Sequence, residues 1–319
     1  MPLSRYLSTI AVCALAIAGL SAAPGSATAQ QEREVFSEDG TISRVVTPVH
    51  DEVPAPQSAV RADVVPIQVT GPSDQRFDLV FVGDGYTSDE LDKYKQDVLN
   101  RWNEMIQVEP FKSEQNSFDV WAVNVVSQES GVSNDPQGTH RSTALEMTFW
   151  CDGIERLLCV NETKALQFAG LAPAADQVIA LANTTKYGGA GGRVATSSGQ
   201  NVKAGQIVLH ELGHSIGGLA DEYDYPDDTY TGPEPREPNA STYTAAQMQQ
   251  NQTKWYRYLG KQSPDGGVVD TYEGAVYHKY GVYRPTENSL MRTLGHPYNL
   301  IGLDAMKAAI ERKNPTSQP

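Results

Sequence analysis

The chain has 319 residues, of which 39% are apolar and 20% charged, a globular composition that argues against wholesale disorder and against a collagen-like fibre. The formal net charge of -14 argues against a general nucleic-acid binder and a polybasic membrane anchor, because both need patches rich in Lys and Arg. The length allows one large domain or two modest ones.

Residues 1–29 have the pattern of a secretory signal peptide. Arg5 provides a short positive region, residues 9–23 an apolar region, and residues 27–29 (A-T-A) a cleavage site before Gln30. The apolar run is shorter than the roughly 20 residues that a membrane-spanning helix needs. We therefore expect a protein without a membrane anchor, secreted to the periplasm or the extracellular space, whose mature chain begins near Gln30.

The next segment, residues 30–75, is polar, rich in Pro, Ser and Val, and has no helical period. This composition predicts a loosely structured arm, a short pro-segment or a strand-bearing extension, ending at the turn signal of residues 71–74. The catalytic domain is expected over residues 76–316. It begins with an apolar strand at residues 78–82, followed by a capping box (Thr87 and Glu90) that starts a helix reaching about Gln107.

Further strands are predicted at residues 118–126 and 177–182, the latter leading into a glycine-rich turn at residues 187–192. The turn lacks the Lys-Ser/Thr of a phosphate loop, so a cleft-edge loop that lets a substrate backbone approach closely is favoured. Strands alternating with helices in this order predict an α+β fold with α/β-like alternation, in which a twisted mixed sheet packs on helices.

Two cysteines remain after export, Cys151 and Cys159, and an oxidising compartment permits a disulfide between them. On one straight helix this pair would lie about 12 Å apart, beyond the ~5.5 Å Cα spacing of a disulfide. A disulfide therefore requires residues 149–160 to turn between the two cysteines. The alternative is a pair of buried, unpaired thiols.

The motif with the clearest chemistry is H-E-L-G-H at residues 210–214, within an apolar segment expected to be a helix. Residues four apart lie on one helix face, so His210 and His214 can share a tetrahedral Zn²⁺. Glu211 projects beside them, where it can hold water without ligating the metal. Two ordinary histidines on a helix are the alternative, but Gly217-Gly218 can turn the chain back and bring carboxylates to the metal.

These carboxylates belong to an acidic cluster that could also bind a structural Ca²⁺ through oxygen ligands. A solvated acidic loop is the alternative interpretation. The cluster consists of Asp221, Glu222, Asp224, Asp227 and Asp228.

The segment HELGHSIGGLADEY, together with LVFVGDGYTSDEL, NVVSQESGVS, TFWCDGIERLL and KYGGAGG, resembles the M64 peptidase family, a metzincin-like group named for an immunoglobulin A-cleaving member. The resemblance covers about residues 76–311. It implies a metzincin-type catalytic domain and a secreted bacterial zinc endopeptidase. The family name is not evidence that this chain cleaves antibodies.

The third metal ligand is the point where the chain departs from the metzincin pattern H-E-x-x-H-x-x-G-x-x-H. Ala220 stands at the usual third position and has no donor atom. Asp221 is the nearest carboxylate and is predicted to close the site. Glu222, Asp224 and Tyr223 are the alternative ligands, and Glu222 could instead be a hydrogen-bond partner of one histidine.

The resemblance also implies roles for residues near the C-terminus. Met291 resembles the methionine that lies beneath the metal ligands on a tight turn, although an ordinary core methionine would fit as well. Tyr298 or His296 could donate a hydrogen bond to the oxyanion of the reaction. A closing helix is expected at residues 303–312 because of its apolar stripe.

The sequence thus predicts a secreted zinc endopeptidase that acts on protein or peptide substrates through a zinc-activated water, with Glu211 as general base. Two other readings keep the same ligands: a non-catalytic zinc-containing binding protein, and a zinc hydrolase of non-peptide substrates. The intact Glu211 argues against the first, because a structural zinc site does not require it.

Overall fold

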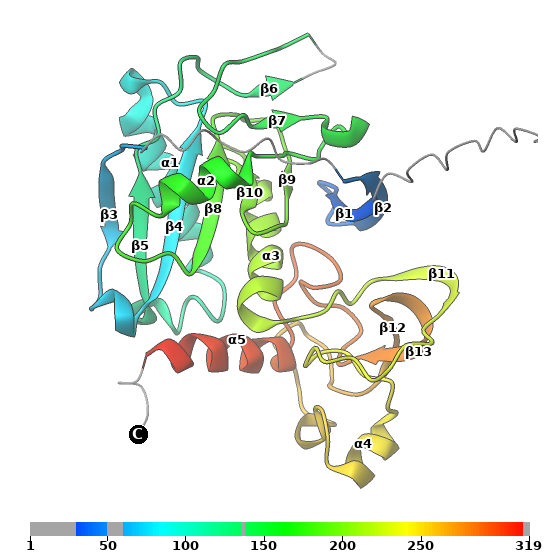
Figure 1. Ribbon diagram of the computed structural model, residues 1–319. Coiled ribbons are helices and arrows are strands. Elements are labelled where there is room, and N and C mark those ends of the chain that lie inside the picture. Colours follow the sequence, from blue (N-terminus) through cyan, green and yellow to red (C-terminus); the bar gives the residue numbers. More distant parts are fainter. Residues whose placement is uncertain (1–29, 50–59, 135–137, 315–319) are drawn as a thin grey trace, which may run out of the picture.

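A computed structural model describes residues 30–49, 60–134 and 138–314, so the expected signal peptide lies outside the described residues. A six-stranded mixed sheet carries helices on both faces, and a smaller region with a three-stranded sheet lies beside it (Figure 1). The predicted α+β class with a mixed sheet is confirmed. The strands are β1 (Gln30–Phe36), β2 (Ile42–Pro48), β3 (Val64–Gln68), β4 (Phe77–Asp84), β5 (Phe118–Val123), β6 (Ser133–Asn134), β7 (Thr148–Phe149), β8 (Gln177–Ala182), β9 (Gly189–Ala190), β10 (Ala195–Ser198), β11 (Asp224–Thr229), β12 (Tyr272–Ala275) and β13 (Tyr277–Arg284). The helices are α1 (Leu91–Met105), α2 (Glu162–Ala169), α3 (Gly205–Gly217), α4 (Ala245–Asn251) and α5 (Leu300–Lys313).

The central sheet has the order β3-β5-β4-β8-β10-β9, with parallel pairing from β5 to β10 and antiparallel strands at both edges. Leu79 and Phe81 of β4 belong to the core shared with α1 and α3, whereas Val80 and Val82 belong to the core shared with α2. Burial on both faces explains why this strand is apolar at consecutive positions.

Most sequence-based element boundaries lie within a few residues of the structure, although the strand expected at residues 118–126 already ends at Val123. The strand at 177–182 is β8, and the capping box of Thr87 and Glu90 is present. Strand β3, however, pairs with β5 inside the central sheet, although it precedes the expected domain start at residue 76. An edge strand of five residues that includes Pro66 carries no clear alternation, which is why composition alone did not separate it from the arm.

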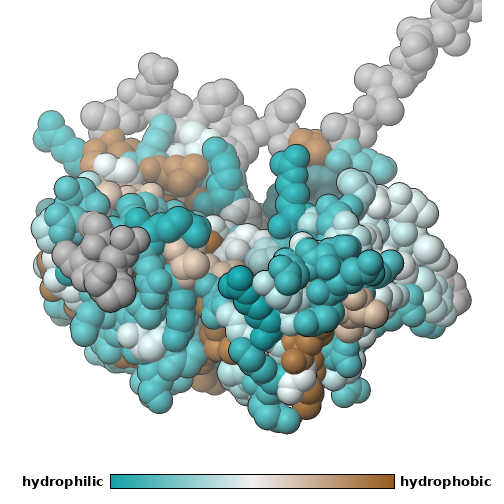
Figure 2. All heavy atoms as spheres, turned by 90° about the horizontal axis from the view of Figure 1, so that it is seen from below, coloured by the Kyte–Doolittle hydropathy of each residue, from teal (hydrophilic) through white to brown (hydrophobic). Residues whose placement is uncertain are grey.

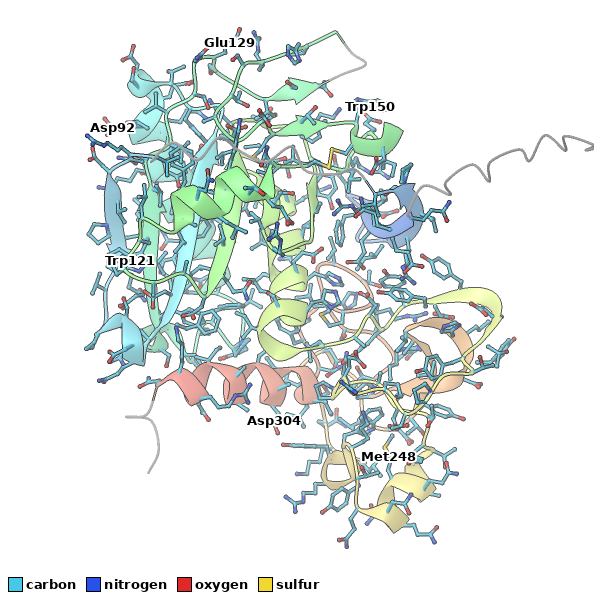
Figure 3. All side chains as sticks on the ribbon, in the orientation of Figure 1. Asp92, Trp121, Glu129, Trp150, Met248 and Asp304 are labelled. Atoms are coloured by element: carbon cyan, nitrogen blue, oxygen red, sulfur yellow. A yellow bond between two sulfur atoms is a disulfide. The ribbon has the colours of Figure 1, made fainter. Side chains whose placement is uncertain are left out.

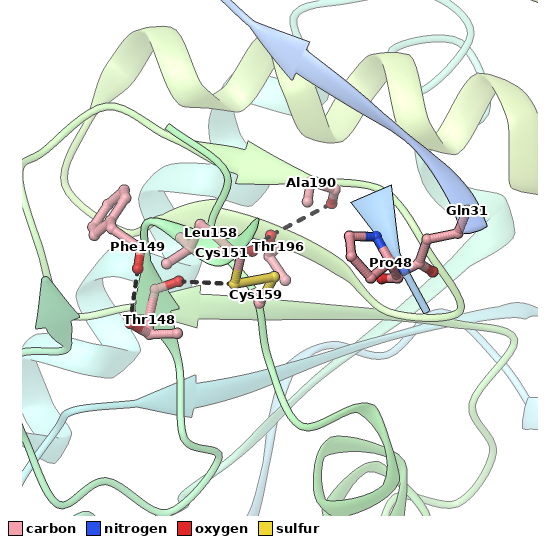
Figure 4. The surroundings of a disulfide bond; sticks show 9 residues. All are labelled: Gln31, Pro48, Thr148, Phe149, Cys151, Leu158, Cys159, Ala190 and Thr196. Atoms are coloured by element: carbon pink, nitrogen blue, oxygen red, sulfur yellow. Dashed lines mark hydrogen bonds between the residues drawn. A yellow bond between two sulfur atoms is a disulfide. The ribbon is translucent and has the colours of Figure 1, made fainter. Parts of the chain in front are cut away.

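The segment between the two cysteines turns as a disulfide requires. Cys151 and Cys159 are bonded, with their Cα atoms 6.1 Å apart. Thr148 exchanges two backbone hydrogen bonds with Cys159, so the chain reverses direction between the two cysteines. Figure 4 shows the bond between their sulfur atoms. The predicted disulfide is therefore confirmed, and unpaired thiols are excluded.

The smaller region follows α3 in the chain. Its three-stranded sheet has the order β11-β13-β12, and around α4 a separate apolar cluster joins Met248 and Trp255 to Ile301 of α5 (Figures 1 and 3). Helix α5 packs against α3, which connects the two regions. Seen from below, the surface is mostly hydrophilic, with apolar side chains in small separate groups (Figure 2). Within the described residues, no helix is long and apolar enough to cross a membrane.

Candidate metal centre

Helix α3 brings the two histidines of the motif together. The Nε2 atoms of His210 and His214 lie 3.0 Å apart. The Nδ1 atom of His210 lies 3.1 Å from the carbonyl oxygen of Leu290, and that of His214 lies 2.7 Å from the carbonyl oxygen of Leu219. An Nδ1–H that donates to a carbonyl leaves the lone pair on Nε2, so both rings are oriented to bind one cation.

The chain returns to the histidines immediately after α3. Gly218 adopts the left-handed conformation, with φ of 60°, and its N–H donates to the carbonyl of His214. After this reversal, Oδ1 of Asp221 lies 3.2 Å from Nε2 of His210 and 3.3 Å from Nε2 of His214. The hydroxyl of Tyr277 donates to Oδ2 of Asp221 at 2.5 Å, which fixes the carboxylate.

Glu222 points away from the histidines. Its buried carboxylate accepts hydrogen bonds from Asn239, Ser289 and Asn299 at 2.7 to 2.8 Å. Burial raises the pKa of Glu222 above its usual value, and the three donors act in the opposite direction. The structure therefore does not support the alternative roles considered for Glu222, as a ligand or a partner of a histidine. Instead, its side chain connects the loop after α3 to the start of α5.

The other acidic residues after α3 do not converge on a calcium site. Asp224 pairs with Arg292 at 2.6 Å, and Asp228 pairs with Nδ1 of His278 at 2.9 Å. The side chain of Asp227 lies outside the described part. Because the described carboxylates of this cluster turn to different partners, the expectation of a structural Ca²⁺ site is not supported.

A fourth candidate ligand, Glu34, comes from strand β1. Its Oε1 lies 3.7 Å from Nε2 of His210, its Oε2 lies 3.8 Å from Nε2 of His214, and Tyr223 donates to Oε1 at 2.5 Å. One donor atom from each of Glu34, His210, His214 and Asp221 lies within 4.8 Å of the others. Sequence analysis missed Glu34 because a glutamate in a polar arm, far from the motif in the chain, carries no distinguishing signal.

The chemistry of these donors fits a divalent cation. Oδ1 of Asp221 is buried without a hydrogen-bond partner among the described residues and faces both Nε2 atoms. Burial lowers the pKa of His214, but the charge of Asp221, its hydrogen bond to the imidazole and the charge of Glu34 together outweigh burial and raise the pKa to about 9. The pocket thus attracts positive charge. Imidazole nitrogens combined with carboxylate oxygens form a ligand set typical of zinc.

Glu211 lies next to the ligands and is not one of them. Burial, followed by the charge of Glu34, raises its pKa to about 7. A Cβ atom on Gly191, in the predicted cleft-edge turn, would lie only 2.0 Å from Oε2 of Glu211. Glycine at this position therefore allows the backbone after β9 to pass directly beside the carboxylate. A carboxyl group with a pKa near neutrality is suited to accept and return a proton.

Glu211, His214 and Asp221 line a cavity of about 700 Å³, together with Gly191 and Tyr277. The lining residues come from the hairpin of β1 and β2, the turn after β9, helix α3 with the loop that follows it, and the smaller region. It provides room for a substrate segment beside the metal donors.

Met291 lies buried on the inner side of α3. A Cβ atom on Gly213, between the two histidines, would lie 2.6 Å from its sulfur atom. The turn is closed by a hydrogen bond of 2.9 Å from the N–H of Leu290 to the carbonyl of Pro297. Met291 thus packs against α3 at Gly213, between the two histidines of the motif.

The two expected oxyanion donors do not line this cavity. Tyr298 is fully buried and donates its hydroxyl to the carbonyl of Leu209. Nε2 of His296 lies 3.2 Å from Nδ2 of Asn288, and His296 borders a different cavity together with Arg284 and Arg292. Tyr277, whose hydroxyl donates to Asp221, does line this cavity, and the sequence did not indicate it.

Two histidines one helical turn apart, a carboxylate from the following loop and a glutamate beside them define the HExxH class of metal-dependent hydrolase centres. The family model for IgA peptidase M64 matches residues 65–266 and 259–310, which is more than half of the chain. The chain therefore belongs to this family of metallopeptidases, as its sequence motifs suggested. No curated protein matches it.

Proposed function

We propose that this protein is a secreted zinc-dependent endopeptidase in which Glu211 is the general base. The observation that carries the proposal is the convergence of His210, His214 and Asp221 beside a cavity that is lined by His214, Asp221 and Glu211. Family membership supports a peptidase and hence a protein substrate. Secretion rests on the signal sequence of residues 1–29.

When bound, zinc supplies Lewis-acid polarisation of a carbonyl and lowers the pKa of water. Residues of the chain transfer the proton and orient the metal ligands. Glu211 accepts a proton from the attacking water and returns it to the nitrogen of the leaving amine as the C–N bond breaks. The carbonyls of Leu290 and Leu219 hold the two imidazoles in place, and Tyr277 holds Asp221.

The test uses the mature chain from Gln30, loaded with zinc and incubated with a denatured protein mixture, with and without a chelator. We expect new peptide N-termini, detected by sequencing or mass spectrometry, only without the chelator. Glu211→Ala should retain about one zinc and lose hydrolysis. Glu129→Ala, which removes an exposed carboxylate from a distant loop, is the matched control (Figure 3).

Three results would contradict the proposal. Full activity of Glu211→Ala would remove the general base. Zinc binding without hydrolysis of any peptide would favour a binding protein, and hydrolysis restricted to non-peptide esters or amides would favour the other hydrolase. The intact mass of the exported protein tests secretion, because retention of residues 1–29 would contradict signal cleavage.

A further inference from the structure

The hairpin formed by β1 and β2 lies directly over the metal centre. It packs beside β9 and α3 (Figure 1), and Gln31 of β1 lies near Ala190 of β9 and the disulfide (Figure 4). Phe36 is only 2% exposed and meets the ring of His210 edge-on, with the ring centroids 5.5 Å apart. The hairpin is therefore packed into the centre, not merely laid on the surface.

Both regions of the protein hold the hairpin. The carbonyl of Gly40 accepts a hydrogen bond of 2.9 Å from Leu294, and the carbonyl of Ser37 accepts one of 3.1 Å from Tyr187. The guanidinium of Arg44 lies 3.6 Å from the centre of the Tyr277 ring. The hairpin thus bridges the two sides of the cavity that a substrate would have to enter.

Four hairpin residues line the same cavity as Glu211, namely Glu32, Arg33, Glu34 and Arg44. The carboxylate of Glu34 approaches both metal-facing imidazole nitrogens, and Tyr223 donates to it. The side chain of a single glutamate therefore reaches the place where water and a substrate carbonyl must meet the metal.

The number of protein ligands decides whether a metal centre of this kind can catalyse hydrolysis. A catalytic zinc site has three protein ligands and keeps one position for water or substrate, whereas four protein ligands make a closed structural site. His210, His214 and Asp221 already supply three. A fourth from Glu34 would close the centre.

We propose that Glu34 is a fourth protein ligand of the metal and that the β1–β2 hairpin (residues 30–48) is an intramolecular inhibitor, which must be displaced before a peptide can bind. This inference rests on the proposed function, since it concerns the regulation of the same centre. In this state the Glu34 carboxylate holds the metal position that a substrate would need, and activity requires the hairpin to move away from the centre.

The experiment compares zinc-loaded mature chains carrying no substitution, Glu34→Gln, Glu34→Asp or Glu38→Gln. Glu38 is the matched control because it is an exposed glutamate of the same hairpin, paired only with Lys203 in the described part of the chain. Calorimetry measures the affinity of acetohydroxamate, a small chelating probe that needs an open metal position. Competition with a chromogenic chelator measures zinc affinity, and thermal unfolding checks the fold.

If the open form is a tenth of the population or less, removing Glu34 should raise acetohydroxamate affinity and peptide hydrolysis by about 10-fold or more. Loss of a ligand should weaken zinc binding by about 10-fold or more. Glu34→Asp keeps the charge but shortens the side chain. Its acetohydroxamate affinity, zinc affinity and peptide hydrolysis should therefore lie between those of Glu34→Gln and those of the unsubstituted chain. Glu38→Gln should match the unsubstituted chain.

Equal acetohydroxamate affinity in the unsubstituted chain, Glu34→Gln and Glu34→Asp would overturn the proposal that the hairpin is an inhibitor. Glu34→Gln could bind acetohydroxamate more tightly and zinc more weakly while no variant hydrolyses a peptide. In that case the proposal of a fourth ligand holds and the endopeptidase proposal fails. If all variants hydrolyse peptides and bind the probe equally, only the inhibitor proposal fails.

Discussion

Gly191 is the position where the smallest substitution should disturb the proposed general base. A Cβ atom there would lie 2.0 Å from Oε2 of Glu211, whereas real Cβ atoms essentially never come closer than 3.0 Å to another atom. The carboxylate or the loop must therefore move by about 1 Å. Misplacement on this scale costs on the order of 100-fold in rate, which is about 2.7 kcal/mol of activation free energy. Gly191→Ala should thus lower kcat/KM about 100-fold.

The backbone of Gly191 does not have a positive φ, so alanine introduces no conformational strain of its own. The assay measures kcat/KM on a peptide substrate with and without Glu34→Gln, together with zinc content and thermal unfolding. Gly170→Ala at the end of α2 is the matched control, since its Cβ would meet only ordinary contacts from 3.4 Å. A folded, zinc-loaded Gly191→Ala protein with activity within threefold of its parent would refute the reasoning.

Three other outcomes follow from the same geometry. Asp221→Ala should lose zinc, measured by metal analysis, whereas Glu222→Ala should keep it. Glu222→Ala should instead lose stability in denaturant unfolding, because each buried donor left unpaired costs about 1–3 kcal/mol. Metal loss in the Glu222 variant alone would reverse the assignment. Met291→Leu nearly conserves volume and should cost less than about 1.5 kcal/mol by thermal unfolding, so a larger loss would show that the sulfur is specifically required. The mature protein, denatured without reductant, should contain no maleimide-reactive thiol, because Cys151 and Cys159 are bonded. Two labelled thiols would contradict this. Removing the bond should lower the free energy of unfolding by about 2 to 3 kcal/mol.

Local patterns were sufficient for much of the fold. Strands β4 and β8 are runs of buried apolar residues, and the start of α1 follows from the reciprocal hydrogen bonds of Thr87 and Glu90. Each depends on neighbours in the chain, whose periodicity or spacing is visible in the sequence. For the segment that contains β3, a strand-bearing extension was only one of three alternatives, because the stability of β3 depends on pairing with β5, which lies some 50 residues later.

The same division applies to the metal centre. The sequence by itself determined that His210 and His214 share a helix face and that a carboxylate follows the reversal at Gly218, because these relations are set by helix geometry over a few residues. It favoured Asp221 over Glu222 as the nearer carboxylate in the chain, but it could not show which of the two side chains faces the histidines. The orientation of the loop, fixed by partners far along the chain, turned one toward the histidines and the other into the core.

Only the tertiary structure brought Glu34, Gly191 and Tyr277 to the centre. Glu34 arrives because Phe36 is buried against His210 and the hairpin is bonded to distant loops. Such contacts join residues that are far apart in the sequence, and they depend on shape complementarity between surfaces that exist only after folding. No period or spacing in the chain encodes them, which is why the ligands on one helix could be read from the sequence and the residues that face them could not.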